Sequence, residues 1–422
     1  MNDLRLVALS GLLIALPPVA AAIHSPAAPE FIAAVGCDPT IQLPAGFCAT
    51  VIAESLGPVR HLVVTPNGDV LASLANGRDA DRNMVAGGVV LLRDANTDGR
   101  WETRKRFGPE GGTGIALGEG YLWFASNTTI YRWKWAPGQL EPAGEAEVVV
   151  SGLPGDQGHV AKPIVVSGGF VYADLGSLTN SCQEQDRAAR SPGRMPCTEL
   201  ETRAGIWRFS TSRAGQKEAD GIRFATGTRN PMSLAFEPRT GVLWMASHGR
   251  DNLSSNWGYS DTLNAELPAE EFGPVAQGAD FGWPYCYYDG LQKKKVQAPE
   301  YGGDGQKVGD CAAKAQPAVA FPGHWAPMDV TFYSGTAFPA EYRGGAFLAF
   351  HGSWNRAPLP QDGFRVVFVP FADGKATGTY TTVFQGKPGT TIRPSGLAVG
   401  PDGALYVASD QAGKIWKITF TR

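Results

Sequence analysis

The stretch TGTRNPMSLAFEPRTGVLWMASHGRD, residues 226–251, contains the pattern that decides the fold. Two apolar runs, MSLAF and VLWMAS, flank the turn EPRTG, and this arrangement predicts a β-hairpin. Polar residues stand at both ends, TRN before the first strand and HGRD after the second. In an antiparallel hairpin these two ends lie side by side, so we expect the polar side chains to gather there.

The same unit recurs along the chain. Each copy has an apolar strand, a Gly- or Pro-rich turn, a second apolar strand, and then small or polar residues. The other copies begin at Arg60, Gly112, Lys162, Ala326 and Arg393. Recurrence of one supersecondary unit is typical of repeat architectures, although the irregular spacing excludes a solenoid of strict period.

Further apolar runs between the hairpins, such as GGVVLLRD and GKIWKITF, bring each unit to about four strands, the size of a propeller blade. The sequence therefore predicts an all-β fold, a six-bladed β-propeller with long inter-strand loops. A β-sandwich or two separate β domains is the alternative. Residues 178–204 and 252–320 are expected to be loops.

Composition agrees with many short strands. The chain has 422 residues with 53 Gly and 31 Pro, which interrupt long helices. The net charge is -3 and no basic block occurs, so nucleic-acid binding is not expected.

The first residues have the layout of a secretory signal peptide. Arg5 is followed by an apolar stretch and then by the small residues Ala20 to Ala22. A membrane anchor is the alternative, but the stretch is short and Pro17 and Pro18 interrupt it. We therefore expect a signal peptide over residues 1–23, a single propeller catalytic domain over 24–422, no stable membrane span after signal removal, and a periplasmic or secreted location.

The cysteines agree with export. The chain has 6 cysteines and no CxxC motif, so a zinc or redox site is poorly supported. Fifteen pairings are formally possible. We expect the nearest-neighbour bridges Cys37–Cys48, Cys182–Cys197 and Cys286–Cys311, each of which would restrict a long loop.

The propeller prediction explains why polar residues recur at the hairpin ends. In a propeller that end of every blade borders one face of the central channel, so the residues there become neighbours. Those at the strand entrances are Arg60, His61, Thr113, His159, Arg229, Asn230, His324 and Arg393. Those at the exits are Asn76, Asn180, residues 248–251, residues 351–356 and Asp410. Such a ring of donors suits a planar anionic ligand, because Arg offers a fixed fork to carboxylate and quinone oxygens.

Each of these residues also has a purely structural interpretation. His159 can be a structural histidine, Arg229 can pair with a surface carboxylate, and Asn230 with Pro231 can form a turn. Gly249 can simply end a strand. The run DANTDG, residues 94–99, begins like a calcium-binding loop, but position twelve is Lys105, so we favour a plain turn over a calcium site.

The chain resembles the soluble quinoprotein glucose/sorbosone dehydrogenases, also called aldose sugar dehydrogenases, and most closely their L-sorbosone dehydrogenase-like branch. The resemblance rests on GGTGIAL, TGTRNPMSLAF, FGWPYC, HWAPMDVTFY, AFHGSWNRAP and IRPSGLAVGPDGALYVAS. It implies a six-bladed propeller that holds pyrroloquinoline quinone (PQQ) and Ca²⁺ on one face.

The resemblance also implies roles for individual residues. His159 matches the catalytic base, and Arg229 matches the group that polarises the quinone carbonyl and binds the cofactor. The backbone carbonyls of Gly249 and Arg250 match the metal ligands. The remaining positions that match cofactor contacts are Asn230, His324, Asn355, Arg356 and Arg393.

Three positions depart from the glucose-oxidising pattern. Gly158 replaces an Asp before the base, Asn355 replaces a cofactor-binding Lys, and Ser395 replaces a second Arg. The resemblance therefore leaves the preferred sugar and the cofactor affinity open.

We therefore expect a PQQ- and calcium-dependent enzyme that transfers hydride from an aldose, a pyranose at C1 or a sorbosone-like sugar aldehyde to the quinone. Electrons are expected to leave to an external acceptor such as a cytochrome, since no CxxCH or GxGxxG motif is present. A calcium-dependent lactonase and a non-catalytic carbohydrate- or protein-binding propeller are the alternatives.

Overall fold

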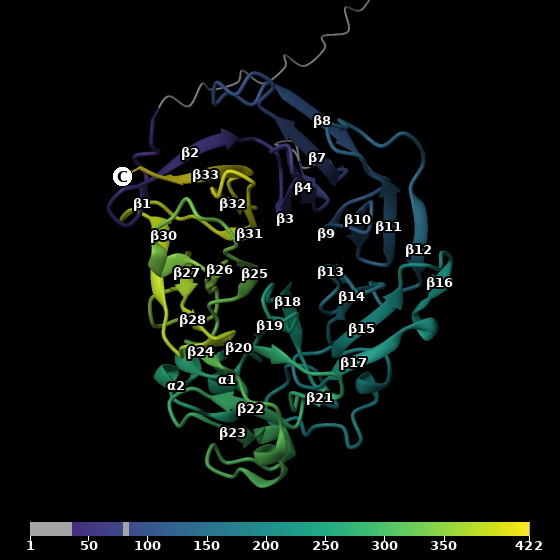
Figure 1. The fold of residues 1–422 in the computed structure, drawn as a ribbon. Coiled ribbons are helices and arrows are strands. Elements are labelled where there is room, and N and C mark those ends of the chain that lie inside the picture. The colour runs from purple at the N-terminus through teal and green to yellow at the C-terminus, as the bar shows by residue number, and fades with distance from the viewer. Residues whose placement is uncertain (1–35, 79–83, 422) are drawn as a thin grey trace, which may run out of the picture. The chain divides into compact units, whose positions relative to one another are not determined.

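The computed structural model describes residues 36–78 and 84–421, in which six main sheets surround a central axis (Figure 1). The predicted signal peptide, residues 1–23, lies outside the described residues. Each sheet is one blade, and the inner strand of each blade contacts the inner strand of the next around a closed ring. The predicted six-bladed β-propeller is confirmed.

The main strands of the first three blades follow one another along the chain, and a short edge strand from a later segment joins each of blades 2 and 3. Blade 1 contains β3 (Val59–Val64), β4 (Val70–Leu74), β7 (Gly88–Arg93) and β8 (Thr103–Phe107). Blade 2 contains β9 (Gly112–Gly118), β10 (Tyr121–Ser126), β11 (Thr129–Lys134), β12 (Glu147–Ser151) and the short β16 (Gln216–Lys217). Blade 3 contains β13 (Ile164–Ser167), β14 (Phe170–Leu175), β15 (Gly205–Ser210), β17 (Ile222–Thr226) and β21 (Ala279–Asp280).

The last two blades also use strands from the beginning of the described chain. Blade 4 contains β18 (Asn230–Phe236), β19 (Leu243–His248), β20 (Glu270–Val275) and β24 (Val319–Phe321). Blade 5 contains β25 (Pro327–Phe332), β26 (Ala346–Phe350), β27 (Arg365–Val369), β30 (Thr381–Gly386) and β1 (Ile41–Gln42). Blade 6 contains β31 (Pro394–Val399), β32 (Leu405–Ser409), β33 (Lys414–Phe420) and β2 (Phe47–Ala53). The six predicted hairpins are the two inner strands of the six blades.

The ring closes through pairing of the two ends of the described chain. β2 runs antiparallel to β33, with Phe47 opposite Phe420 and Ala53 opposite Ile415. The disulfide Cys37–Cys48 ties the segment before β2 to that strand. Blade 6 is therefore assembled from strands at both ends of the described chain.

Apolar clusters fill the interfaces between neighbouring blades. In β4, Val70, Ala72 and Leu74 pack toward blade 6, whereas Leu71 packs toward blade 2. Successive side chains of a strand point to opposite faces, so a blade enclosed on both faces needs apolar residues at consecutive positions. This explains why the inner strands read as continuous apolar runs.

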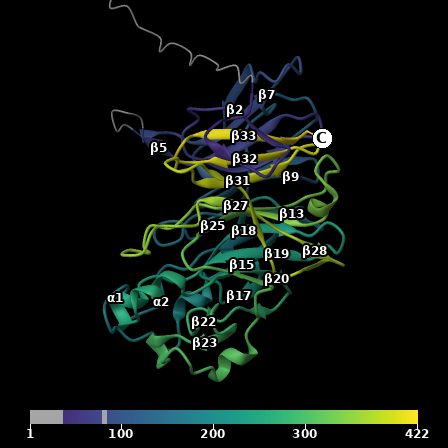
Figure 2. The same ribbon diagram turned by 90° about the vertical axis from the view of Figure 1, so that its left-hand side faces the viewer.

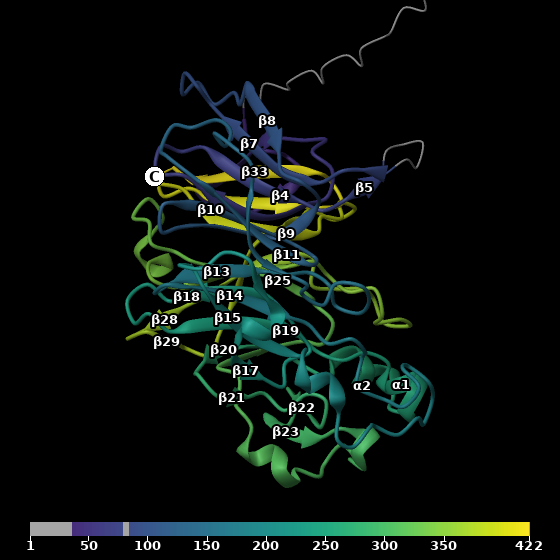
Figure 3. The ribbon, with the colours of Figure 1, turned by 90° about the vertical axis from the view of Figure 1, so that its right-hand side faces the viewer.

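Several short elements project from the blades. They are β5 (Gly77–Arg78), β6 (Met84–Val85), α1 (Leu253–Trp257), α2 (Asp261–Glu266), β22 (Cys286–Asp289), β23 (Lys294–Gln297), β28 (Phe371–Ala372) and β29 (Lys375–Ala376). Figures 2 and 3 show β5, α1 and α2 projecting from the same face of the ring. The expectation that residues 252–320 form a loop is wrong in part, because the segment contains α1, α2, the blade strand β20, the edge strand β21 and the hairpin of β22 and β23. Ser260 caps α2 by accepting a hydrogen bond from the Leu263 backbone N–H.

Short 3-10 turns complete the secondary structure, at Thr198–Glu201, Glu218–Asp220, Pro299–Tyr301, Gly309–Ala313 and Ala340–Tyr342. Across residues 36–78 and 84–421, no helix has the length and apolar character that a membrane crossing requires. The three predicted disulfides, Cys37–Cys48, Cys182–Cys197 and Cys286–Cys311, are confirmed.

The buried His61 on β3 makes stability depend on pH. Its Nε2–H donates to the Met328 carbonyl oxygen at 2.8 Å. Burial, and next the charge of Arg60, lower the pKa of His61 from 6.5 to about 4. The unfolded chain therefore binds more protons between these two pH values, and the contribution of His61 to stability is lost as the pH falls from 6.5 to about 4.

Replacing His61 with Gln keeps a donor for Met328 and removes the titration. We expect the His61→Gln variant to have a shallower pH dependence between pH 4 and pH 6.5 than the wild type. The slope of the unfolding free energy should fall by up to about 1.4 kcal/mol per pH unit, the value for one proton. Urea denaturation across this range measures the slope, and equal slopes for the two proteins would contradict the assignment.

Candidate active site

A cavity of 230 Å³ lies where the inner hairpins of blades 3, 4 and 5 begin and end. Its walls combine guanidinium, imidazole, amide and carboxylate groups from distant parts of the chain. The lining residues are His159, Arg187, Arg229, Asn230, His248, Gly249, Asp251, Glu270, His324, Ala326, Trp354 and Asn355. The structure thus brings His159, Arg229, Asn230, Gly249, His324 and Asn355 of the predicted site together.

His159 lies just before β13 and has a defined tautomer. Its Nδ1 is 2.9 Å from the backbone oxygen of Ser177 and 3.0 Å from the Ser177 hydroxyl oxygen, which itself donates to the Thr179 carbonyl. Both contacts of Nδ1 are therefore acceptors, so Nδ1 carries the proton and Nε2 carries a lone pair. Burial, followed by the charge of Arg229, holds the pKa of His159 well below its usual value. His159 is a neutral imidazole whose Nε2 makes no hydrogen bond to any described residue.

Two glycines shape the space around His159. Gly158 has a φ of +75°, and a Cβ added to it would lie 2.4 Å from the Leu178 carbonyl oxygen. A Cβ added to Gly176 would lie 2.6 Å from the His159 Cβ. The position before His159 therefore cannot carry a side chain, which gives a physical reason for the departure noted in the sequence.

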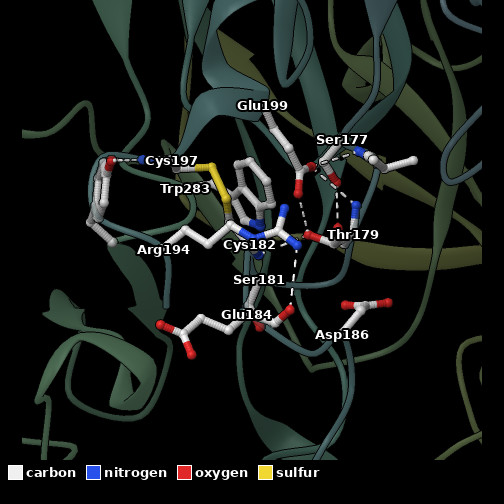
Figure 4. The surroundings of a disulfide bond; sticks show 12 residues. Ser177, Thr179, Ser181, Cys182, Glu184, Asp186, Arg194, Cys197, Glu199 and Trp283 are labelled. Atoms are coloured by element: carbon white, nitrogen blue, oxygen red, sulfur yellow. Dashed lines mark hydrogen bonds between the residues drawn. A yellow bond between two sulfur atoms is a disulfide. The ribbon is translucent and has the colours of Figure 1, made fainter. Parts of the chain in front are cut away.

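Glu199 binds the backbone that directly follows Ser177 (Figure 4). The Glu199 carboxylate accepts hydrogen bonds from the Leu178 and Thr179 backbone N–H groups at 2.8 and 3.1 Å, and from the Thr179 hydroxyl at 2.6 Å. The disulfide Cys182–Cys197 and the ring of Trp283 pack beside this carboxylate. The disulfide loop therefore supports the residue that orients His159.

Removing this disulfide with a Cys182→Ala/Cys197→Ala double substitution should lower the free energy of unfolding. The bridge closes a loop of 15 residues, for which chain entropy predicts about 3 kcal/mol. Amide hydrogen exchange should also speed up at Leu178 and Thr179, because Glu199 loses its anchor.

A Cys286→Ala/Cys311→Ala double substitution is the matched control. It removes the bridge that spans 25 residues in the other insert. It should lower stability without altering exchange at Leu178 and Thr179. Unchanged exchange there after loss of Cys182–Cys197 would contradict the proposed support.

Arg229 precedes β18 and is held by three acceptors. Its Nε donates to the Asn180 carbonyl at 3.2 Å, one Nη to the Gly249 carbonyl at 2.8 Å, and the other Nη to an Asp251 carboxylate oxygen at 2.9 Å. The side chain is 6% exposed. Each terminal nitrogen retains a further N–H, since a guanidinium has five donors. Arg229 is therefore rigidly placed in the cavity wall with donors to spare.

Asp251 is the central anion of the cavity. Its carboxylate pairs with Arg229 and with Arg187, both at 2.9 Å, and accepts a hydrogen bond from Asn355 Nδ2 at 2.7 Å. The Asn180 side chain fixes its backbone at both the N–H and the carbonyl. Burial alone would raise the pKa of Asp251. The nearby positive charges, first that of Arg229, outweigh burial and hold this pKa well below its usual value. Asp251 is therefore ionised and organises the neighbouring donors.

His324 and Asn355 form the opposite wall. The Nε2–H of His324 donates to the Asn264 carbonyl at 2.6 Å, and its Nδ1 faces Asn355 Nδ2 at 3.2 Å. The Asn355 Oδ1 and the Asn230 Oδ1 are buried and have no hydrogen-bond partner within the described part of the chain. Buried polar atoms are normally satisfied, so these two oxygens could accept hydrogen bonds from, or coordinate, a group bound in the cavity.

Glu270, the first residue of β20, closes the floor of the cavity. It accepts hydrogen bonds from the Gly249 backbone N–H at 2.8 Å and from the Ala326 N–H at 3.3 Å. Burial raises the pKa of Glu270 to about 7, against the opposing effect of these groups and of nearby positive charge. The carboxyl group is therefore partly protonated near neutral pH.

Three of the predicted residues direct their side chains elsewhere. The Arg250 guanidinium pairs with the buried Glu300, although its predicted role belongs to its backbone carbonyl. The Arg356 guanidinium pairs with Glu266 at 2.8 Å. Arg393 donates to the backbone oxygens of His351 and Gly352 and lies over the Phe364 ring at 4.9 Å. None of these three side chains lines the cavity.

Comparison with known proteins places the chain in a family. It matches the TrAA12-like family over residues 41–421. The chain belongs to the TrAA12-like family. An uncharacterized protein of Borreliella burgdorferi is 26% identical over 210 residues, 47% of this chain and 48% of that protein. A pyrroloquinoline quinone-dependent pyranose dehydrogenase of Coprinopsis cinerea is 29% identical over 230 residues, 46% of this chain and 30% of that protein.

The match therefore spans less than half of the length of these two curated relatives. Among solved structures, the holo form of the PQQ domain of the Coprinopsis cinerea pyranose dehydrogenase has a TM-score of 0.72 and 19% identity. That alignment covers 90% of this chain and 97% of the domain. At this identity the likeness shows a shared fold. No comparison distinguishes the sorbosone branch, which stays a prediction.

Several cavity residues of this TrAA12-like chain have no assigned role in the sequence analysis. The sequence analysis does not predict Arg187 or Glu270, because neither lies at a hairpin end. His248, Asp251 and Trp354 fall within the predicted exit segments but receive no individual role. The signal that could have found Asp251 is its position after Gly249 and Arg250, at the exit of the hairpin that Arg229 begins. No pattern in the sequence marks Glu270.

Proposed function

We propose that this protein is a PQQ- and Ca²⁺-dependent dehydrogenase that oxidises C1 of an aldose or pyranose, or the hydrated aldehyde group of a sorbosone-like sugar. One observation carries the proposal: His159 presents an unprotonated Nε2 to the same cavity that Arg229 lines. Family membership and the name of the Coprinopsis cinerea relative support the cofactor and the substrate class.

The donor set of the cavity fits a planar, carboxylate-bearing quinone. Arg229 keeps two N–H groups beyond its three internal bonds, and Arg187 lines the same wall. Guanidinium groups suit carbonyl and carboxylate oxygens. Asn230, His324 and Asn355 would contribute further contacts. When bound, PQQ would supply the electron sink for the hydride.

The oxygen atoms near Gly249 fit a hard cation. The Gly249 carbonyl accepts one hydrogen bond from Arg229, which leaves its second lone pair for a metal. The Arg250 carbonyl makes no hydrogen bond within the described residues and is the second ligand that we propose. Calcium takes oxygen ligands and tolerates backbone carbonyls. The unpartnered Oδ1 atoms of Asn230 and Asn355 belong to residues that line the same cavity.

The residues of the chain would then divide the chemistry. Removal of a hydride from C1 requires removal of the proton from the C1 hydroxyl, and His159 Nε2 is placed to accept it. Arg229 would stabilise negative charge that develops on the accepting side. Ser177 fixes the tautomer and the orientation of His159. We propose that Arg356 and Arg393 act on the cofactor site indirectly, because Arg356 bonds the Gly323 carbonyl oxygen next to His324 at 3.1 Å and Arg393 bonds the carbonyl oxygens of His351 and Gly352.

The preferred sugar should differ from that of the glucose-oxidising branch. Gly158 leaves no space for the carboxylate that precedes the base in that branch. Ser395, which replaces a second Arg, is fully buried and donates to the Val59 carbonyl between blades at 2.7 Å. A sugar would therefore find fewer charged contacts here, and apolar contacts would matter more.

We also propose that the protein works in the periplasm or outside the cell and passes electrons to a separate acceptor. The three disulfides support an oxidising compartment.

A calcium-dependent lactonase is the second candidate. The cavity holds two carboxylates, Asp251 and Glu270, and two amide side chains, Asn230 and Asn355, which is a set that such an enzyme would use around its ion. Against it, Asp251 is engaged by two guanidinium groups, and Glu270 is partly protonated near neutral pH. Those contacts favour the dehydrogenase.

Reconstitution separates the two candidates. The purified protein is incubated with Ca²⁺ alone, or with Ca²⁺ and PQQ, and assayed for dye reduction with a panel of aldoses and sugar aldehydes and for hydrolysis of sugar lactones. The proposal predicts dye reduction that requires both additions. Hydrolysis with Ca²⁺ alone would establish the lactonase, and binding without turnover would establish a carbohydrate-binding propeller.

A further inference from the structure

Trp354 is an exposed indole at the edge of the cavity. It is 68% exposed, and it is the one large exposed apolar side chain among the described residues that also lines the cavity. The other tryptophans of the chain are buried or partly buried. An exposed Trp leaves a large apolar area in water, so its position at a binding cavity requires an explanation.

The backbone on both sides of Trp354 is held firmly. The Ser353 backbone N–H donates to the Asp362 carbonyl at 2.9 Å, and the Ser353 hydroxyl donates to Gln361 at 2.7 Å. On the other side, Asn355 is bonded to Asp251 in the cavity wall. Ser353 is only 1% exposed. The indole is therefore presented to solvent by a fixed loop rather than by a loose one.

Among the residues that the structure describes, no aromatic ring packs against the indole of Trp354 and no cationic side chain lies over it. Both neighbouring tryptophans in the same region differ: Trp325 lies under Arg365 at 4.5 Å, and Trp257 lies under Arg190 at 5.7 Å. The indole of Trp354 is thus available to a ligand.

The polar groups beside Trp354 and the indole together suit a ligand ring that has one apolar face and a polar edge. Arg187, whose side chain is 39% exposed, reaches the same cavity from the disulfide loop. The C–H groups on one face of a pyranose carry slight positive charge and match the negative face of an indole, whereas its hydroxyl groups match guanidinium and carboxylate partners. Small-molecule sites commonly combine an aromatic wall with a few polar groups.

We propose that Trp354 is the platform on which the sugar ring stacks, and that it makes the enzyme select ring-closed pyranoses over open-chain aldehydes. This inference rests on the proposed function, because it names the substrate class that the same cavity accepts. The carbon to be oxidised would point inward toward His159, and the remainder of the ring would lie against the indole. The open-chain, sorbosone-like substrate would gain nothing from this surface.

Steady-state kinetics of the enzyme reconstituted with PQQ and Ca²⁺ provide the first test. A Trp354→Ala variant should raise KM for an aldopyranose such as D-glucose by about fivefold to tenfold, with kcat changed less than about twofold. Its KM for glycolaldehyde, which forms no pyranose ring, should stay unchanged. Trp354→Phe, which retains a smaller ring, should lie between the wild type and Trp354→Ala.

Leu291→Ala is the matched control, because Leu291 is 60% exposed and lies outside the cavity lining. It should leave both KM values unchanged. Equal KM values for the wild type and Trp354→Ala would overturn the proposal. An equal rise in KM for D-glucose and for glycolaldehyde would also overturn it, because Trp354 would then affect the cavity without distinguishing a pyranose ring from an open chain.

Fluorescence gives a readout that does not depend on turnover. Acrylamide quenching of the purified protein is measured with D-glucose and with sorbitol, its open-chain alditol. D-glucose should protect part of the wild-type emission, sorbitol should not, and the Trp354→Phe variant should show no protection. Absence of protection in the wild type would overturn the proposal. If no sugar is oxidised but protection is present, the proposed function fails and the stacking platform stands.

Discussion

His159→Ala is expected to lower kcat for sugar oxidation by at least about a hundredfold, the lower end of the contribution of a general base. The neutral ring of His159 presents Nε2 to the cavity, because two oxygen acceptors of Ser177 hold the proton on Nδ1. No other described histidine that lines the cavity is held in this tautomer by two acceptors. KM should change little, because proton removal matters in the transition state. Stopped-flow reduction with the reconstituted variant measures the step directly.

Ser177→Ala serves as the control for His159. It removes the hydroxyl acceptor but keeps the backbone carbonyl that also binds Nδ1, so kcat should fall far less than in His159→Ala. Full turnover by His159→Ala would remove the proposed base. A loss in Ser177→Ala equal to that in His159→Ala would show that the serine takes part in the reaction itself.

Arg229→Lys is expected to lower kcat/KM by about a hundredfold to a thousandfold, the range found when a donor to developing charge is removed. The lysine keeps a positive charge opposite Asp251, so the protein should fold. A single ammonium cannot reach Asn180, Gly249 and Asp251 together and still offer N–H groups to a ligand. Turnover within threefold of the wild type would contradict this role.

Arg229→Ala separates catalysis from stability. It would leave the buried Asp251 with Arg187 as its remaining guanidinium partner. Removing one partner of a buried ion pair costs about 3–5 kcal/mol. The alanine variant should therefore melt at a lower temperature, whereas Arg229→Lys should melt close to the wild type. Equal melting temperatures for all three proteins would show that Asp251 does not depend on Arg229.

The fold could be predicted because its cause lies in local sequence patterns. Each inner hairpin packs against a neighbour on both faces, so apolar residues occupy consecutive positions and a Gly- or Pro-rich turn separates the strands. The polar residues that follow these strands gather because the hairpin ends meet. His159, Arg229 and Asn355 could therefore be placed in one cavity from sequence.

The rest of the site depends on side-chain directions that spacing does not determine. Arg250 follows Gly249 in the chain, but its guanidinium turns to a buried Glu300 in the insert. Glu270 begins a third strand and reaches the cavity only because blade 4 places it beside Gly249. Trp354 belongs to an aromatic segment that could equally have packed inward. Long side chains choose among several partners, and only the assembled blades decide which.

The pairing of β2 with β33 closes the ring of blades by joining the beginning and the end of the described chain. The main strands of the other blades come from neighbouring segments. The short β1 also joins blade 5 from the beginning of the described chain, but the pairing of β2 with β33 closes the longer loop and carries the largest loop-closure entropy. Blade 6 bears Asp410, which pairs with His351 and Arg60 on the side of the cavity. This pairing should form last, so a newly made chain would complete the face that bears the cavity only after β33 has been synthesised.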